Sequence, residues 1–413
     1  MSKRMRVPLA IALAALAVIL AEGAAHACPA TPPVCSALPG PVLTIDSGDT
    51  QEPLLKNLGR KLRDSTARPM TIVYNLTGSC TLSADMYAAN KLKVNLKYVP
   101  STAEDAAWTP ASASCPCTPD AAGNTIDLAI SALFVQSCNL GATPAGLGLI
   151  TGPIQGYGFV APKASAQKAI VAEEAYFVFG FGQAGGVTPW TDEQHMFIRP
   201  TTKSTLLSLA ANIGVLGSKW HGVQENASSD VVNAVSTSTA PDATIGILGI
   251  EVFDANRQNL NLLAYRAYQQ NFAYWPDSSP TAFDKKSLRD GHYTPWSPTQ
   301  YIAAVDANNV PTNANAKYWL DLVLGNAPNP ATDIPGLGLP SVIKVGLVPD
   351  CAMKVSRTAD GGPLALYTPA APCGCYYEAN TGPTPAAPAY CTACTTDTTC
   401  NGGHCRYGYC EAN

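Results

Sequence analysis

The chain has 413 residues, of which 14% are charged, and its formal net charge at pH 7 is −4. The sequence contains no arginine run or basic patch, which excludes the usual electrostatic footprint of a nucleic-acid-binding protein. Glycine and proline number 33 and 34, so we expect a compact, loop-rich protein that is long enough to form two lobes.

The first 27 residues have the organisation of a secretory signal peptide. A basic start, an apolar core and a small-residue cleavage motif follow one another at residues 3–6, 7–21 and 25–27. The apolar run is too short for a transmembrane helix, and no later segment is suited to span a membrane. Cys28 stands directly after the cleavage motif, which lacks the leucine that lipoprotein sites prefer. We therefore expect export to the periplasm or cell surface, with cleavage and release favoured over lipidation.

All 14 cysteines lie after this signal peptide. Because exported proteins fold in an oxidising compartment, disulfide bonds are the expected state of these cysteines, including Cys80. None occurs between Cys138 and Cys351, so a cysteine-free middle separates the first third of the chain from the tail, and we expect disulfide bonds in both. In the motifs at residues 115–117 and 373–375, the two cysteines are too close for an easy mutual bridge. We expect each of them to bond elsewhere.

The cysteines at residues 391–410 have the most regular spacing in the chain. Zinc binding would explain the paired spacing and the nearby His404, whereas export favours disulfides. Five cysteines lie in this stretch, so one of them needs a partner outside it. The candidate partners are Cys351, Cys373 and Cys375. We expect residues 351–413 to form a disulfide-rich tail.

Strands and helices alternate along the first third of the chain. The expected strands are residues 41–45, 70–74 and 125–130, and apolar residues with helical spacing follow the first strand at 53–62. Such alternation predicts a mainly parallel α/β sheet. Ligands of these sheets bind beyond the carboxyl ends of the strands, so three polar loops offer hydroxyls and backbone N–H groups to one place.

The middle of the chain is expected to form a second lobe. Residues 141–158 are rich in glycine and are expected to form turns, and residues 157–162 are expected to cross into the second lobe as a strand. A strand at 260–265 is expected to carry the chain back. The expected divisions are residues 28–157 and 256–350 for lobe 1 and residues 158–255 for lobe 2.

Residues 198–205 combine an arginine with a run of hydroxyls at the start of an apolar, helical segment. Arg199 presents a planar fork of donors that can grip an oxyanion at two points. Ser204 or Thr205 can cap the following helix, whose first N–H groups and positive dipole end attract negative charge. An ordinary surface helix cap beside an arginine is the alternative interpretation.

The order of these pieces resembles the type II periplasmic solute-binding proteins, and among them the phosphate-binding proteins of ABC importers. The resemblance covers residues 41–345 and implies a two-lobed α/β fold with an anion site between the lobes. Residues 47–50, 78–81 and 127–131 are similar to the family's lobe 1 loops, and Arg199 with Ser204-Thr205 is similar to its lobe 2 arginine and Ser-Gly-Thr turn. The expected ligand-binding residues are Gly48, Asp49, Thr50, Ser79, Cys80, Thr81, Ser131, Arg199, Ser204 and Thr205.

Two departures from the family pattern concern the ligand. The family typically has an aspartate directly after the serine of the third strand, where it accepts the proton of a hydrogen phosphate. Here that position is Ala132, and the glycine between Ser204 and Thr205 is also missing. Without the acceptor, the site loses one means of preferring a protonated oxyanion. Sulfate-like oxyanions and organic ligands therefore stay open beside phosphate.

These observations favour an exported, non-catalytic solute-binding protein that captures a small oxyanion, with phosphate as first choice, for uptake. The sequence has neither the G-x-S-x-G motif of serine hydrolases nor the H-E-x-x-H motif of zinc hydrolases. Residues 180–185 match the G-x-G-x-x-G pattern of dinucleotide-binding proteins, but they do not open a helix as that motif requires. We therefore expect no catalytic residue, cofactor or metal. The expected partners are the anion and an ABC importer membrane complex, and the expected state is a monomer. The alternative is a structural or adhesive surface protein that keeps the fold but has lost anion binding. An exported hydrolase is the weakest alternative.

Overall fold

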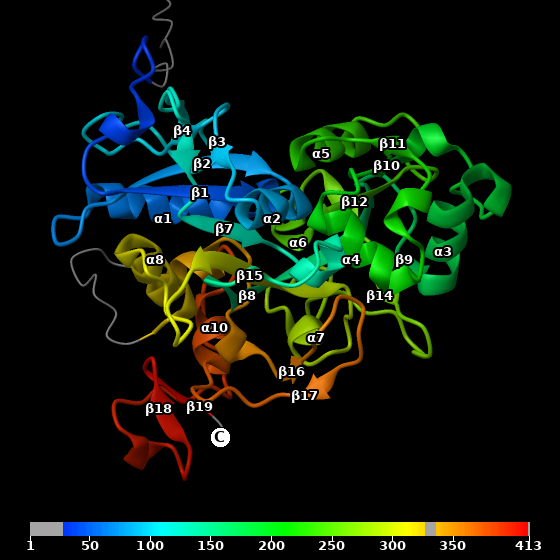
Figure 1. Cartoon of the computed structure of the whole chain (residues 1–413). Helices are drawn as coiled ribbons and strands as arrows, with labels where there is room; N and C mark the ends of the chain where they lie inside the picture. Colours follow the sequence, from blue (N-terminus) through cyan, green and yellow to red (C-terminus); the bar gives the residue numbers. More distant parts are fainter. Residues whose placement is uncertain (1–27, 327–335, 412–413) are drawn as a thin grey trace, which may run out of the picture.

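The computed structural model describes residues 28–326 and 336–411. Two α/β lobes lie side by side in Figure 1, the first coloured blue to cyan with the later elements β15 (Trp296–Ala304) and α8 (Ala314–Leu324) in yellow, and the second green. The expected two-lobed α/β architecture with a cysteine-rich C-terminal extension is confirmed. The expected signal peptide lies outside the described residues. Within the described part of the chain, no helix combines the length and the apolar character needed to cross a membrane.

A mixed sheet forms the centre of the first lobe. In sheet order its strands are β8 (Leu147–Pro162), β15 (Trp296–Ala304), β7 (Leu128–Ser131), β1 (Val42–Gly48), β2 (Thr71–Thr77), β4 (Lys97–Tyr98) and β5 (Cys115–Pro116). Strands β7, β1 and β2 run parallel, whereas β15 is antiparallel to both β7 and β8. A separate ribbon pairs β3 (Lys91–Leu92) with β6 (Asn124–Thr125). The parallel strands bring the loops after β1, β2 and β7 to one edge.

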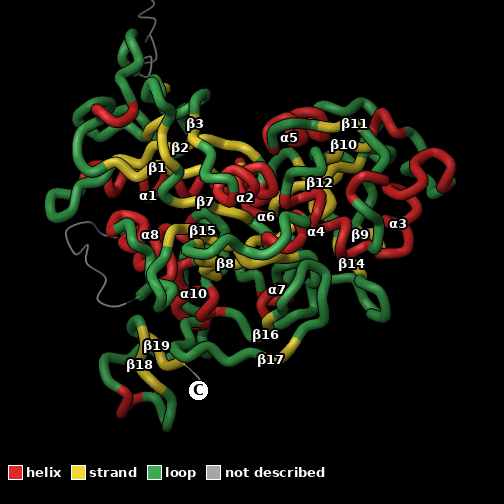
Figure 2. The backbone as a smooth tube through the Cα atoms, in the orientation of Figure 1, coloured by secondary structure: helices red, strands yellow, loops and turns green. Residues whose placement is uncertain are grey.

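Helices pack around this sheet (Figure 2). They are α1 (Glu52–Asp64), α2 (Ser79–Tyr87), α8 (Ala314–Leu324) and α9 (Leu339–Lys344). The sequence favours α1 because its buried leucines recur every three or four residues, with Glu52 in the first turn and Lys61 in the last turn, as the helix dipole prefers. Gly59 lets α1 approach closely, since a Cβ there would lie 2.9 Å from a Val99 methyl carbon.

The second lobe has its own short strands and helices. Its strands are β9 (Ala169–Val171), β10 (Met196–Ile198), β11 (Val223–Gln224), β12 (Ile245–Gly249), β13 (Leu260–Leu262) and β14 (Ala264–Arg266). Its helices, together with a short helix near the extension, are α3 (Ala172–Phe181), α4 (Ser204–Ile213), α5 (Ser228–Ser236), α6 (Ile250–Ala255) and α7 (Lys286–Arg289). Strand β10 lies parallel to β11 and β12, and β12 is antiparallel to β8.

Strand β8 links the two lobes, because it pairs with β15 in the first lobe and with β12 and β13 in the second. The expectation of turns throughout residues 141–158 is therefore wrong from Leu147 onward. A Cβ at Gly152 would lie 2.2 Å from a ring carbon of Tyr301, and one at Gly158 would lie 2.6 Å from Leu262. These glycines make room on crowded sheet faces and do not turn the chain.

All fourteen cysteines are paired in seven disulfides. The pairs are Cys28–Cys115, Cys35–Cys117, Cys80–Cys138, Cys351–Cys373, Cys375–Cys391, Cys394–Cys405 and Cys400–Cys410. The predictions for Cys80, for the two short motifs and for an outside partner of the tail stretch are confirmed, and that partner is Cys375. Because the sulfur of Cys28 is bonded to Cys115, it is not free for lipid attachment.

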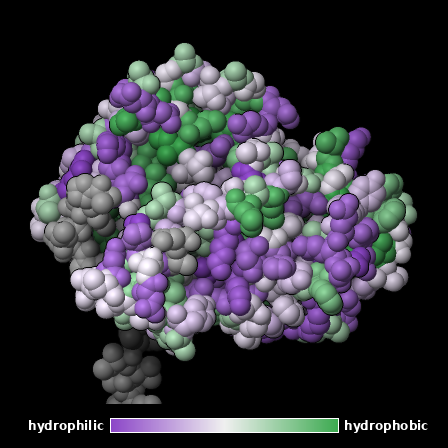
Figure 3. All heavy atoms as spheres, turned by 90° about the horizontal axis from the view of Figure 1, so that it is seen from below, coloured by the Kyte–Doolittle hydropathy of each residue, from purple (hydrophilic) through white to green (hydrophobic). Residues whose placement is uncertain are grey.

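The C-terminal extension packs against the body of the molecule, below the first lobe and α7 in Figure 1. Its elements are β16 (Val355–Ser356), β17 (Ala365–Leu366), α10 (Gly374–Asn380), β18 (His404–Arg406) and β19 (Tyr409–Glu411). Met353, Val355 and Tyr377 are buried in the same apolar cluster as Tyr157 and Trp296. Seen from below, the face that carries the extension is hydrophilic over its centre, with separate apolar patches (Figure 3).

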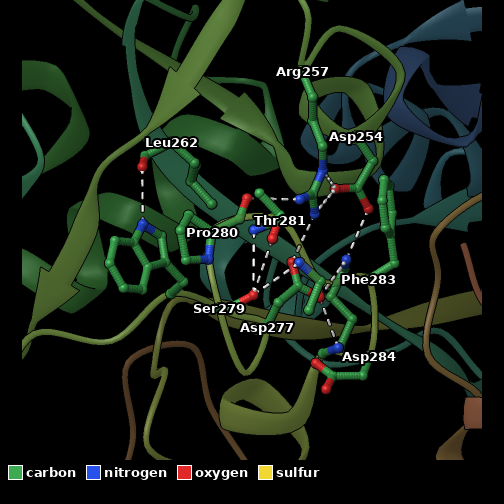
Figure 4. A network of polar contacts seen from close by, with 12 residues as sticks. Asp254, Arg257, Leu262, Asp277, Ser279, Pro280, Thr281, Phe283 and Asp284 are labelled. Carbon is green, nitrogen blue, oxygen red and sulfur yellow. Dashed lines mark hydrogen bonds and ion pairs between the residues drawn. The ribbon is translucent and has the colours of Figure 1, made fainter.

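A buried cluster of four charges joins the end of α6 to the segment before α7 (Figure 4). Lys285 Nζ lies 2.8 Å from Asp254 and 2.9 Å from Asp277, and Arg257 contacts the same two carboxylates at 2.6 and 2.8 Å. Burial alone would lower the pKa of Lys285, but the two carboxylates raise it above its ordinary value. The Arg257 guanidinium also stacks over the Phe283 ring at 3.9 Å. Each charge therefore has two partners of opposite sign.

Candidate functional site

The three polar loops of the first lobe meet at the carboxyl edge of its sheet. Ser79 Oγ, at the start of α2, accepts a hydrogen bond of 3.0 Å from the backbone N–H of Ala132, directly after β7. A Cβ at Gly48 would lie 3.7 Å from Thr50 Oγ1 and 3.9 Å from Ser79 Oγ, so both hydroxyls flank the end of β1. Thr50 is buried, and its Oγ1 has no hydrogen-bond partner among the described residues. The structure thus brings these loop residues together.

Other predicted loop residues have local roles. Ser131 is fully buried, and its hydroxyl donates to the Leu133 carbonyl at 3.0 Å. Cys80 is bonded to Cys138, so it has no free thiol, but its backbone N–H donates to the Thr202 carbonyl of the second lobe at 3.2 Å. Thr81 is half-buried on α2. The backbone contact of Cys80 places the second loop directly against the stretch that follows Arg199.

Arg199 lies directly after β10 and is completely buried. Its Nη2 donates to both carboxylate oxygens of Asp49, at 3.1 and 2.9 Å, and to the Asn226 carbonyl at 2.9 Å. Its Nη1 donates to the Ser228 hydroxyl at 2.5 Å. The surface-cap interpretation of this stretch is therefore wrong for the arginine. Its anionic partner within the described residues is a side chain from the opposite lobe.

Three residues of the second lobe contact the Asp49 carboxylate, Arg199 and Ser228 by hydrogen bonds and Lys203 as an ion pair. Ser228, the first residue of α5, donates its backbone N–H and its hydroxyl to one carboxylate oxygen, both at 2.9 Å. Lys203 Nζ lies 3.6 Å from the other oxygen. We call Arg199, Lys203 and Ser228 the anion cradle. Burial alone would raise the pKa of Asp49, but Arg199 and Lys203 hold this pKa below its usual value.

The start of α4 differs from the expected cap. The helix begins at Ser204, the residue at the N-cap is Lys203, and no side chain bonds the cap, so capping by Ser204 or Thr205 is wrong. Both residues are buried, so neither hydroxyl lies at the surface. The side chain of Lys203 reaches the first lobe, where it also donates to the Thr77 carbonyl. The lysine of this stretch, and not its hydroxyls, completes the cradle.

Asp46 is a second carboxyl beside the cradle, and it comes from the interior of β1. It is fully buried, with one oxygen accepting from Thr77 Oγ1 at 2.9 Å and the other without a partner among the described residues. Burial raises the pKa of Asp46 to about 7, against the opposing pull of the Thr77 bond and the charge of Lys203. Near neutral pH this carboxyl is therefore poised between its neutral and charged forms.

A buried polar chain also crosses from one lobe to the other. Gln51, next to Thr50, donates to Gln155 on β8, and Gln155 donates to Glu251 at the start of α6 at 3.1 Å. Burial raises the pKa of Glu251 well above its usual value, which favours the neutral acid. The lobes are therefore joined by neutral amides beside β8 and by charges at the cradle.

Sequence reasoning missed Lys203, Ser228 and Asp46. The signal for Ser228 is its place at a helix start soon after β11, as with the other loops, but that segment reads as an ordinary capped helix. Asp46 is an acid within an otherwise apolar strand, and Lys203 stands inside the stretch already singled out. Asp49 was predicted, but as a member of a ligand-binding loop. In the structure it occupies the cradle.

No protein-family model matches the chain, and no curated protein matches it. Solved structures with a similar fold include a protein from Clostridium perfringens assigned as a phosphate ABC transporter substrate-binding protein, with phosphate bound. It is 11% identical with a TM-score of 0.49, and the match covers 75% of this chain and 99% of that one.

Two further similar structures serve different roles. An ABC-type phosphate transport receptor from Vibrio cholerae is 13% identical with a TM-score of 0.40, over 64% of this chain and 88% of its own. The regulatory domain of OxyR from Pseudomonas aeruginosa, in its reduced form, is 10% identical with a TM-score of 0.36, and the match covers 64% of this chain and 89% of that one. At these identities the likeness concerns the fold alone, and the ligands belong to those proteins.

Proposed function

We propose that this protein binds a small oxyanion between its two lobes, with phosphate as first choice, as an exported, non-catalytic solute-binding protein. The observation that carries the proposal is the buried Arg199, whose guanidinium converges with the Ser228 N–H, the Ser228 hydroxyl and Lys203 on one carboxylate. A buried group of such donors suits an anion, because charge-assisted hydrogen bonds replace its hydration.

In the proposed binding step, the oxyanion exchanges with the Asp49 carboxylate in the anion cradle. The hydroxyls of Thr50 and Ser79, at the end of β1 and the start of α2, then face it from the first lobe. Asp46 can accept a proton from a protonated oxyanion when it is ionised, a role for which Ala132 has no group. Of the ten expected ligand residues, the proposal keeps Thr50, Ser79 and Arg199 as direct contacts of the anion. It adds Lys203, Ser228 and Asp46.

Export and uptake belong to the same proposal. Seven disulfides are typical of proteins that fold in an oxidising compartment. Delivery of a captured anion into the cell would need an ABC importer membrane complex as partner, and capture between the lobes is suited to a monomer.

The test is calorimetric titration of the purified protein with phosphate and with sulfate. We expect binding of at least one anion, and a loss of at least about tenfold in affinity for Arg199→Ala, because a hydrogen bond to a charged group contributes about 1.5–3 kcal/mol. Arg266→Ala, on the surface of the same lobe, is the matched control and should bind normally. Heat with neither anion, or full affinity in Arg199→Ala, would refute the proposal.

One observation favours the alternative of a structural or adhesive surface protein. Asp49 already neutralises Arg199 and accepts from Ser228, so groups of the chain itself pair with the donors of the cradle. A protein that had lost its ligand would keep such a contact as an ordinary interlobe ion pair. Asp49→Asn separates the two functions, because binding by the variant would show that the cradle still accepts an anion, whereas no binding by either the wild type or the variant would favour the alternative.

A further inference from the structure

Residues 355–366 of the extension form a hairpin, which we call the C-terminal hairpin. Strands β16 and β17 pair at its base, where Val355 faces Leu366 and Ser356 faces Ala365. The base is fixed to the body of the protein, because Val355 is buried in the apolar cluster around Trp296 and the Lys354 N–H donates to the Arg289 carbonyl at 2.9 Å. The tip therefore projects from a rigid support.

Arg357 fixes the direction of the hairpin. Its Nη1 donates to the carbonyls of Thr294 and Trp296, at 3.0 and 3.1 Å, and its guanidinium stacks on the Trp296 ring at 4.2 Å. Trp296 is the first residue of β15, the strand that lies between β7 and β8. The hairpin is thus anchored at the start of β15, the strand that pairs with the lobe-linking β8.

The tip of the hairpin binds the first lobe through Asp360. Ser137 donates its hydroxyl to one carboxylate oxygen and Ser297 of β15 donates to the other. Ser137 belongs to the short helical turn Val135–Cys138, which the Cys80–Cys138 disulfide ties to α2. This contact joins the extension to the loop that follows β7, one of the three loops at the candidate site.

The same tip touches the second lobe through Gly361. Its φ is +66°, and a Cβ there would lie 2.7 Å from the carbonyl oxygen of Ala211 on α4. The hydroxyls of Ser297 and Ser208, also on α4, are 3.1 Å apart. Helix α4 therefore meets the tip near its last turns, while Lys203, just before its first turn, contacts Asp49.

We infer that the C-terminal hairpin is a clasp that holds the two lobes together. Asp360 ties it to the loop of residues 134–138 in the first lobe, and Gly361 abuts α4 in the second. Separation of the lobes would pull one of these two contacts apart. If the hairpin stayed with the second lobe, the Asp360 carboxylate would lose its donors, which is costly for a partly buried charge; if it stayed with the first lobe, its packing against α4 would be lost. The extension thus opposes opening from the side of β15, and any solute exchange requires its release.

Hydrogen–deuterium exchange and small-angle X-ray scattering, both without added anion, test the clasp. In Asp360→Ala we expect faster exchange in residues 134–138 and in α4, together with a larger radius of gyration. Thr358→Ala, an exposed residue of the same hairpin, is the matched control and should behave as the wild type. Because no anion is present, the result does not depend on the proposed ligand.

Ser137→Ala removes one donor and leaves the hairpin sequence intact, so it guards against a failure of Asp360→Ala to fold. The same changes in weaker form are expected. Wild-type exchange and scattering in both variants would overturn the clasp. Faster exchange confined to residues 134–138, with an unchanged radius of gyration, would also overturn it, since the hairpin would then support only its own lobe.

Discussion

Asp49 brings an ionised carboxylate into a cradle that could otherwise hold a free anion. Asp49→Asn keeps the size of the side chain but removes its charge, so Arg199 and Lys203 would lose the group that neutralises them. We expect phosphate or sulfate to bind about tenfold more tightly or better, which corresponds to about 1.4 kcal/mol. Calorimetry of the variant beside wild type measures this. Asp321→Asn in the first lobe is the control, and weaker binding by Asp49→Asn would mean that Asp49 supports the ligand.

Asp46 should make stability depend on pH. Its pKa is about 7 in the folded protein and 3.8 as the unperturbed value, so between these values the folded state binds more protons than the unfolded state. Stability therefore falls as pH rises through this window, by about 2–3 kcal/mol between pH 5 and 8. Asp46→Asn should lack this part of the slope in urea unfolding at several pH values. Parallel pH profiles for variant and wild type would contradict the assignment.

The sequence identifies Arg199 and several hydroxyls of the candidate site, because an arginine before a helix start and polar strand ends are local patterns. It does not identify what Arg199 binds. Asp49 and Ser228 are 179 residues apart and meet only because the lobes are closed. Contacts of this kind depend on the relative placement of two packed bodies, and no local pattern records that placement.

At the scale of elements, removing one charge from the buried cluster of Figure 4 should lower the free energy of unfolding strongly. Asp277→Ala would leave Lys285, 2% exposed, with only Asp254 as its counter-charge. We expect a loss of about 3–5 kcal/mol in the free energy of unfolding, measured with urea. Glu173→Gln breaks an exposed pair with Arg266 and should change stability by less than about 1 kcal/mol. A similar small effect for Asp277→Ala would contradict the buried role.

The Cys80–Cys138 disulfide closes a loop of 58 residues between α2 and the turn that carries Ser137. Its removal by Cys80→Ser with Cys138→Ser should lower the free energy of unfolding by up to about 4 kcal/mol, through the extra freedom of the unfolded chain. We expect the effect to exceed that of removing Cys400–Cys410, which closes a loop of only 10 residues. Equal effects of the two removals would argue against the entropic origin.

Strand β8 illustrates where element prediction fails. Glycines usually break strands, so the stretch from residue 141 reads as turns. In the fold, these glycines face Tyr301, Leu262 and Ile250, whose side chains fill the space that a Cβ would need. The strand is selected by long-range packing on its two faces. The strands of the parallel sheet, in contrast, are predictable because their apolar runs are local.

At the scale of the whole molecule, the clasp should determine how the protein responds to the proposed ligand. If the clasp keeps the lobes closed, added phosphate should leave the radius of gyration of the wild type nearly unchanged. The same addition should reduce the radius of Asp360→Ala, because ligand contacts with both lobes would replace the clasp. Scattering with and without phosphate measures both. A marked decrease in the wild type would show that its lobes open in solution despite the hairpin.

The α/β sheet follows from the alternation of strands and helices, the two-lobed arrangement from the family resemblance, and the disulfide-rich extension from the cysteine spacing. The docking of the extension does not follow, because Asp360 and Arg357 stand in a segment with no periodic pattern. Their partners Ser137, Ser297 and Trp296 are distant in sequence. The divisions at residues 157/158, 255/256 and 350/351 stay predictions.

The seven disulfides form two sets that never cross the middle of the chain. One set closes entirely within residues 28–138 and the other entirely within residues 351–410. A chain that enters an oxidising compartment from its N-terminus can therefore complete the first set before β15, which must insert between β7 and β8, has arrived. Early oxidation would constrain α2 and its neighbours while the central sheet still lacks a strand. Maturation would then end with two steps: β15 inserts into the central sheet, and the independently bonded extension docks afterwards.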